Sequence, residues 1–124
     1  MSKAKLSGLT DEAKVSFKVN GESIGTVAIS NKDDLRSLRD AINTKTTSTG
    51  VTASMGATNG EIVLTDSTGK NIEISDYAST DSAGGAGADL DITGLNTDGT
   101  SASGPETLDG TNTTATVTGQ VTFT

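Results

Sequence analysis

Between residues 31 and 45 the apolar residues recur every three or four positions, a spacing that places them on one face of an α-helix. The residues on this face are Leu35, Leu38, Ala41 and Ile42. Ser30 or Asn31 is expected to cap the first turn, where Asp33 and Asp34 place negative charge at the positive end of the helix dipole. The pattern therefore predicts one amphipathic helix that packs through a single apolar stripe.

A strand-like alternation of apolar and polar residues precedes this helix over residues 14–20, and the dipeptide Asn20-Gly21 ends it. Asn and Gly are the residues most tolerant of the positive φ angles that a two-residue hairpin loop requires. A loop of this length pairs Val19 with Glu22. The pattern thus predicts two antiparallel strands joined by a tight turn.

The returning strand over residues 22–29 has apolar residues of two parities. Ile24 is at an even position whereas Val27 and Ile29 are at odd positions, so all three face the core only if the strand contains an extra residue. Gly25 is the expected position of this β-bulge, because glycine adopts positive φ without steric cost.

Three further short strands are predicted after the helix, over residues 51–55, 62–64 and 72–77, with turns at Asn59-Gly60 and at the sequence DSTG. Each strand can pair antiparallel with its neighbour in the sequence. The predicted fold class is therefore α+β, a small and mostly antiparallel sheet of order β-β-α-β-β-β packed on one helix.

These elements occupy residues 14–77 and leave flanks of different composition. Residues 1–13 are expected to form a polar lead, and residues 78–112, rich in Ala, Gly, Ser and Asp, a loop-rich extension with one short strand at 89–93. Residues 113–124 alternate Thr with apolar residues and are expected to form a long closing strand. This strand is either a remnant of an internal repeat or a neighbour of the first strand. The second arrangement is favoured, because close chain ends suit insertion into a larger protein.

Composition and charge narrow the possible functions. The 124 residues are 31% hydrophobic and 2% aromatic, which allows only a thin core. The residues expected to fill it are Val15, Phe17, Ile24, Leu35, Leu38, Ile42, Val51, Ile62, Leu64, Ile72 and Ile74.

The net charge is −7, and residues 71–124 contain 8 acidic and no basic side chains. This negative charge disfavours binding to nucleic acid and to anionic membranes. No run of apolar residues is long enough to span a membrane, and the N-terminus lacks the apolar core of a signal peptide.

Candidate chemistry is restricted to carboxylates, because the chain has neither His nor Cys. Histidine acid–base catalysis, thiol nucleophiles and the usual zinc sites are excluded, so we expect no enzyme activity and no cofactor. The sequence GGAGAD over residues 84–89 matches the opening of a calcium-binding nonapeptide repeat, with Asp89 and Asp91 as candidate ligands. A single copy lacks half of the ligands that stacked repeats supply, so we interpret the segment as a flexible acidic loop.

Four segments, taken in order, resemble the flagellin hook IN motif of bacterial flagellins and hook-associated proteins. They are VSFKVNGESI (15–24), DLRSLRDAIN (34–43), TGVTAS (49–54) and EIVLTDSTGKNIEI (61–74). The namesake pair is Ile42-Asn43. Ile42 belongs to the apolar helix face, and the Asn43 amide is expected to hydrogen-bond the backbone of a neighbouring strand. With Asn20 and Gly21 of the hairpin, this pair forms the predicted structural motif.

The resemblance covers about half of the chain and implies a structural component of the flagellar filament, the organelle of bacterial motility. More specifically, it implies a secreted, surface-exposed outer domain of flagellin. Its partners would be other flagellin subunits, bound through terminal helices that this sequence lacks, and the isolated domain is expected to be monomeric. The alternatives are a domain of a hook-associated or filament-cap protein and a surface adhesin that binds glycans. An adhesin would need aromatic faces for sugar stacking, and the chain has one Tyr and two Phe.

Overall fold

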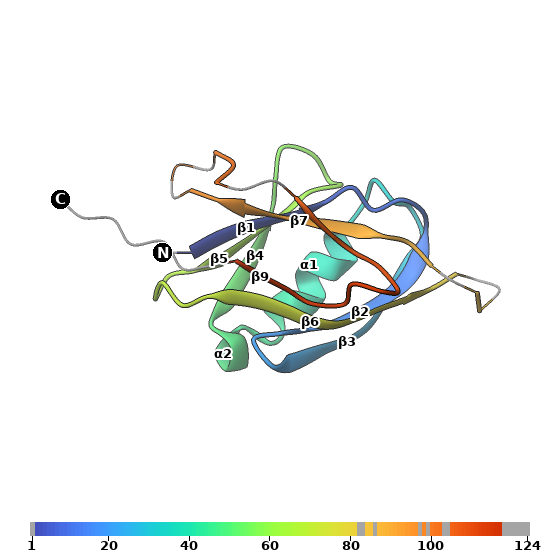
Figure 1. The fold of residues 1–124 in the computed structure, drawn as a ribbon, viewed down its shortest axis with the longest axis horizontal. Coiled ribbons are helices and arrows are strands. Elements are labelled where there is room, and N and C mark those ends of the chain that lie inside the picture. The colour runs from blue at the N-terminus through green and yellow to red at the C-terminus, as the bar shows by residue number, and fades with distance from the viewer. Residues whose placement is uncertain are drawn as a thin grey trace.

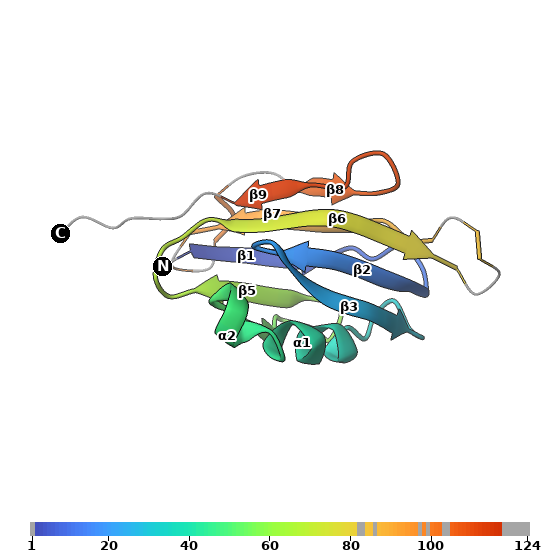
Figure 2. The ribbon, with the colours of Figure 1, turned by 90° about the horizontal axis from the view of Figure 1, so that it is seen from below.

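The described part of the chain folds into two antiparallel β-sheets with two short helices on one side (Figures 1 and 2). The computed structural model describes residues 2–81, 84–85, 87–96, 98, 100–102 and 105–117. The strands are β1 (Ser2–Ser7), β2 (Ala13–Val19), β3 (Glu22–Ile29), β4 (Val51–Met55), β5 (Ile62–Asp66), β6 (Ile72–Thr80), β7 (Leu90–Leu95), β8 (Glu106–Leu108) and β9 (Ala115–Val117). The helices are α1 (Arg36–Asn43) and α2 (Thr46–Thr49). A mostly antiparallel α+β fold is thus confirmed.

The strands form two sheets, whereas the pattern predicts one. The first sheet has the order β4-β5-β1-β7-β8 and the second the order β3-β2-β6-β9. Consecutive strands β5 and β6 belong to different sheets, because β5 pairs with β1 and β6 pairs with β2. The expected pairing of sequence neighbours after the helix therefore holds for β4 and β5 and fails for β5 and β6. Two facing sheets can bury the inner face of every strand. The apolar face of one helix is too narrow to cover that surface.

The expected polar lead over residues 1–13 is wrong, because it contains β1, the central strand of the first sheet. Ala4 and Leu6 have no exposed surface, and the half-buried Lys3 and Lys5 alternate with them. The lysines give the segment the composition of a solvent-exposed loop, although buried and half-buried residues alternate along it as in a strand. Their long aliphatic stems cover apolar surface while their charges stay in water.

The C-terminal part contains more strand than the loop-rich extension expected over residues 78–112. β6 continues to Thr80, β7 pairs with β1, and β8 pairs with β7. The expected closing strand is present in part as β9, but β9 pairs with β6 and not with β2. β2 has no free edge, because β3 and β6 already flank it. Residues 118–124 of the expected strand lie outside the described residues.

Helix α1 is shorter than the sequence pattern predicts, and it begins at Arg36. The Leu35 backbone N–H donates a hydrogen bond of 2.7 Å to the Asn59 carbonyl, in the loop between β4 and β5. Asn31 does not cap the helix, because its side chain accepts a hydrogen bond from the Asp33 N–H at 2.9 Å within a separate turn. The segment before α1 is therefore held by a local turn and by a hydrogen bond to the β4–β5 loop, and not by helical backbone hydrogen bonds.

The core lies between the two sheets and beneath α1, which packs against the edge strands β3 and β4. Every residue that the sequence assigns to packing is buried, including the three large side chains of the helix stripe, Leu35, Leu38 and Ile42. The segments expected to be polar or loop-rich add further core side chains that are at most 2% exposed: Leu6, Leu90, Ile92 and Leu108. The C-terminal strands thus complete the core.

Candidate functional site

Asn43 is the last residue of α1 and lies beside β4, an edge strand of the first sheet. Its side-chain oxygen accepts a hydrogen bond of 2.7 Å from the Ala53 backbone N–H, and its Nδ2 donates one of 2.9 Å to the Ala53 carbonyl. One amide group thus satisfies both backbone groups of a residue on the side of β4 where no strand pairs. The Asn43 side chain takes the place of a neighbouring strand and fastens the end of α1 to the sheet.

The preceding residue, Ile42, points elsewhere. It has no exposed surface and belongs to the core that α1 shares with β3 and β4. Successive helix residues are separated by about 100° around the axis, so two adjacent positions reach different surroundings. Ile42 therefore fixes how deeply α1 sits on the core, and Asn43 fixes its end against the edge of the sheet.

The hairpin residues Asn20 and Gly21 both have positive φ angles, 48° and 84°, as a type I′ turn requires. The Asn20 side-chain oxygen accepts a hydrogen bond of 2.8 Å from the Glu73 N–H, and its Nδ2 donates one of 3.3 Å to the Thr49 carbonyl. The Asn20 backbone N–H donates 2.8 Å to the Glu73 carbonyl. Asn20 therefore connects the β2–β3 turn to β6 and to α2.

Phe17 lies between two β-bulges. The register of β2 against β3 shifts at this level, and Gly25 has a φ of 82°, as the parity of the apolar residues predicts. The register of β2 against β6 also shifts there, and Asp76 has a φ of 53°. The predicted strands do not include this second bulge, although the sequence contains a signal for it. The buried residues Ile74 and Tyr77 differ in parity within one strand.

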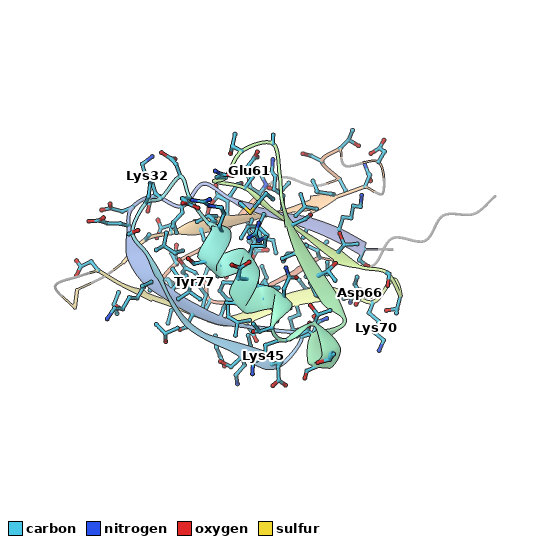
Figure 3. All side chains as sticks on the ribbon, turned by 180° about the vertical axis from the view of Figure 1, so that it is seen from behind. Lys32, Lys45, Glu61, Asp66, Lys70 and Tyr77 are labelled. Carbon is cyan, nitrogen blue, oxygen red and sulfur yellow. The ribbon has the colours of Figure 1, made fainter. Side chains whose placement is uncertain are left out.

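Asp66 is a buried carboxylate that the sequence pattern places simply in a turn. It has no exposed surface, and its Oδ1 accepts hydrogen bonds from the backbone N–H and the hydroxyl of Thr68. Its Oδ2 has no hydrogen-bond partner among the described residues and faces Gly50, where a Cβ would lie 3.6 Å away. Figure 3 shows Asp66 beside α2. Asp66 pairs with Ser2 of β1 and Val51 of β4, and these neighbours from distant segments are not revealed by sequence spacing.

The two candidate metal ligands make structural contacts. The Asp91 Oδ1 accepts a hydrogen bond of 2.7 Å from the Thr107 hydroxyl on β8, and the Asp89 backbone N–H donates 3.0 Å to the Thr10 hydroxyl. No group of three or more acidic side chains that could hold a metal ion occurs in the described part of the chain. Residue 86 of the GGAGAD sequence lies outside that part.

Two pKa values far from their ordinary range have local structural causes. The Arg36 side chain donates hydrogen bonds of 2.8 and 2.7 Å to the Asp34 carboxylate, which lowers the pKa of Asp34 to about 2. Burial raises the pKa of Tyr77 to about 12. The first group belongs to an ion pair at the start of α1 and the second to the core, so both shifts report on packing and pairing.

A polar groove of about 610 Å³ lies beside β1 and β7. Lys5 and Ser7 of β1, Asp91 and Thr93 of β7, and a few residues that follow β7 line it. No aromatic side chain is among its described lining residues, so the described lining offers none of the stacking faces that sugar sites use. In the described part of the chain, no helix has both the length and the hydrophobicity to cross a bilayer.

Two facing antiparallel sheets, a helix bonded to an edge strand, and polar side chains engaged in structural contacts define a small α+β structural domain. Residues 14–68, from β2 to the turn after β5, match the family model of the flagellin hook IN motif. The match covers less than half of the 124 residues, and over this segment the chain is similar to the flagellin hook IN motif. Asn20, Gly21, Ile42 and Asn43 all lie within the match. No curated protein matches the sequence.

Proposed function

We propose that this chain is a surface-exposed outer domain of a flagellar filament protein. The domain adds a folded, passive body to the outside of the filament, while helices elsewhere in the protein carry out polymerisation. The observation on which the proposal rests is that the first and last described strands end close together, at one end of a domain that contains the IN motif.

Hydrogen bonds connect these two ends through the segment between β5 and β6. The Ser2 hydroxyl donates a hydrogen bond of 2.6 Å to the Lys70 carbonyl, and two residues further along Ile72 pairs with Val117. In Figure 1 the start of β1 and the end of β9 accordingly lie at the same end of the molecule. A domain entered and left at one end can be inserted into a host chain without distorting it.

The surface supports a passive role. Residues 71–124 contribute 8 acidic side chains and no basic ones, so copies of the domain repel one another at this surface. The Asn43 amide occupies backbone groups at the edge of β4, where an exposed strand would otherwise invite pairing with another chain. Both features favour a domain that stays monomeric when isolated.

The proposal is tested by inserting residues 2–117 into a polymerising flagellin in place of its own outer domain. We expect the chimera to form filaments whose core is unchanged and whose surface shows extra density at large radius in electron cryo-microscopy. The same host with a short Gly/Ser linker at the insertion point serves as the control. A chimera that is folded by circular dichroism but does not polymerise, while the linker control does, would contradict an outer position.

The adhesin alternative is tested on the isolated domain. Specific binding on a glycan array, or calcium binding by calorimetry, would favour an adhesin over a passive filament domain. We expect neither signal, because the described groove lacks aromatic faces and the described acidic residues form no metal-holding group.

A further inference from the structure

The chain contains two Asn–Gly dipeptides, and the structure holds them very differently. Asn20 is bonded through both atoms of its side-chain amide, to Glu73 and to Thr49. Asn59 is exposed, and its side chain makes no hydrogen bond to any described residue. Within the described part of the chain, the Gly60 N–H that follows it is held by one long bond of 3.2 Å to the Thr58 hydroxyl.

We propose that Asn59 is a site of spontaneous deamidation in the folded protein and that Asn20 is protected. The Gly60 backbone nitrogen loses its proton and attacks the Asn59 side-chain carbonyl carbon. A new C–N bond closes a five-membered succinimide, and the bond to the side-chain nitrogen breaks to release ammonia. Water then opens the ring at either carbonyl and leaves aspartate or isoaspartate. The net change is the addition of one water and the loss of one ammonia, with no redox step.

The structure explains why the two sites differ. The reaction requires the side-chain carbon to swing onto the nitrogen of the next residue, and glycine permits this because it has no side chain. At Asn20 the oxygen and the nitrogen of the amide are held on β6 and α2, and the positive φ of 48° fixes the turn. Both hydrogen bonds have to break before the ring can close there. At Asn59 no described contact of the side chain has to break.

Deamidation at Asn59 reaches the start of α1. The Asn59 carbonyl accepts the 2.7 Å hydrogen bond from the Leu35 N–H, directly before the helix. Gly60 also lies close to Asp33, since a Cβ on Gly60 would be 3.4 Å from the Asp33 Cα. Isoaspartate adds a methylene group to the main chain, so it displaces this carbonyl, whereas ordinary aspartate leaves the main chain unchanged. The isoaspartyl product is therefore expected to release the segment before α1.

Incubation of the 124-residue chain in warm, mildly alkaline buffer tests the proposal, with tryptic peptides 19–32 and 46–70 analysed by mass spectrometry. Each peptide contains one of the two dipeptides. We expect the Asn59 peptide to deamidate roughly tenfold faster than the Asn20 peptide in the native chain, because two hydrogen bonds protect Asn20. In urea, where both sites are unfolded, the two rates should converge. Equal rates in the native chain, or faster reaction at Asn20, would overturn the proposal.

A second measurement separates deamidation from general loosening of the turn. Hydrogen exchange of the Leu35 amide is compared in three samples: fresh protein, aged protein enriched in isoaspartate at position 59, and the variant Asn59→Asp. We expect faster exchange only in the aged sample, because Asn59→Asp retains the normal main chain. The variant Asn59→Ser, which cannot form the ring, should show no change in its Leu35 amide on ageing. Faster exchange in aged Asn59→Ser would assign the effect to another site and contradict the proposed consequence.

Discussion

The Tyr77 hydroxyl donates a hydrogen bond of 2.6 Å to the backbone carbonyl of Ala88. Tyr77 belongs to β6 in the second sheet, whereas Ala88 lies just before β7 of the first, so this bond ties β6 to the segment that leads into β7. The Tyr77 ring also stacks against Phe17, with the ring centroids 6.4 Å apart. The single tyrosine of the chain is thus both a core side chain and a polar connection between β6 and the segment before β7.

Replacement of Tyr77 by Phe keeps the ring and removes the hydroxyl. The buried Ala88 carbonyl loses a donor, so we expect the free energy of unfolding to fall by about 1–2 kcal/mol at neutral pH. Urea denaturation followed by circular dichroism measures the loss. Phe17→Leu, which reduces the ring contact and keeps the hydrogen bond, provides the comparison. If the stability of Tyr77→Phe is unchanged, the hydrogen bond to Ala88 in the folded chain is no more favourable than the one that the hydroxyl makes to water in the unfolded chain.

Alkaline pH should weaken the fold through the same residue. The pKa of Tyr77 is about 12 in the folded chain, against 10.0 for an exposed tyrosine, mainly because the side chain is buried. The unfolded chain therefore loses the phenol proton first, and stability decreases as pH rises from 10 towards 12, by about 2–3 kcal/mol in total. This decrease should be absent from Tyr77→Phe. Because the chain has one Tyr and no Trp, tyrosinate absorbance follows this group alone.

Asn43→Ala should destabilise the protein by about 1–2 kcal/mol, because the Ala53 N–H and carbonyl both lose their partner at the edge of β4. Ser37→Ala on the exposed face of α1 is the matched control and should change stability by less than about 0.5 kcal/mol. Size-exclusion chromatography of Asn43→Ala also tests whether the uncovered strand edge promotes self-association. Equal stability of the two variants would remove the structural role assigned to the amide.

Gly25→Ala tests the bulge opposite Phe17. The φ of Gly25 is 82°, and no atom lies within 4 Å of an added Cβ, so the whole effect comes from the backbone conformation. We expect a loss of about 1–2 kcal/mol. Gly110→Ala is the control, because that site is equally open and its φ is not in the left-handed region. Thermal denaturation of the pair isolates the cost of the positive φ angle.

Acid should act at the start of α1. Arg36 holds the pKa of Asp34 at about 2, below the ordinary value of 3.8, mainly through hydrogen bonds from its side chain. The stabilising contribution is therefore present above pH 3.8 and is lost as pH falls towards 2. Carboxyl NMR titration of Arg36→Gln should show the pKa of Asp34 moving upward towards its ordinary value. Arg39→Gln should move it less, since Arg39 acts on Asp34 only at longer range and pairs with Asp40.

Strong local signals predicted their elements correctly. Asn20-Gly21 forms the expected turn with Val19 opposite Glu22, and the parity of Ile24 and Val27 locates the bulge at Gly25. These features depend on the steric preferences of a few consecutive residues, which the sequence displays directly. The buried helix stripe is predictable for the same reason.

The features that the sequence did not reveal depend on distant partners. The partition into two sheets depends on β1, which pairs with β5 and β7. These partners are far away in the sequence: Lys3 and Leu95, which pair, are 92 positions apart. The helix start is displaced because the Leu35 amide bonds to Asn59, and local signals at Asp33 point to an earlier start. In the candidate site, the amide chemistry of Asn43 indicates an edge contact, but its partner Ala53 is known only from the structure.

The segment that matches the IN motif does not contain all the neighbours of its own strands. Within it, β2–β3 and β4–β5 are two hairpins linked by α1, and each hairpin has one inner strand, β2 or β5, that presents a full row of backbone donors and acceptors outward. Segments on either side of the match, β6 and β1, occupy these rows. The matched segment therefore relies on one strand from each flank to complete the pairing of β2 and β5. Expression of residues 14–68 alone would leave the unpaired edges of β2 and β5 exposed to solvent or to other chains.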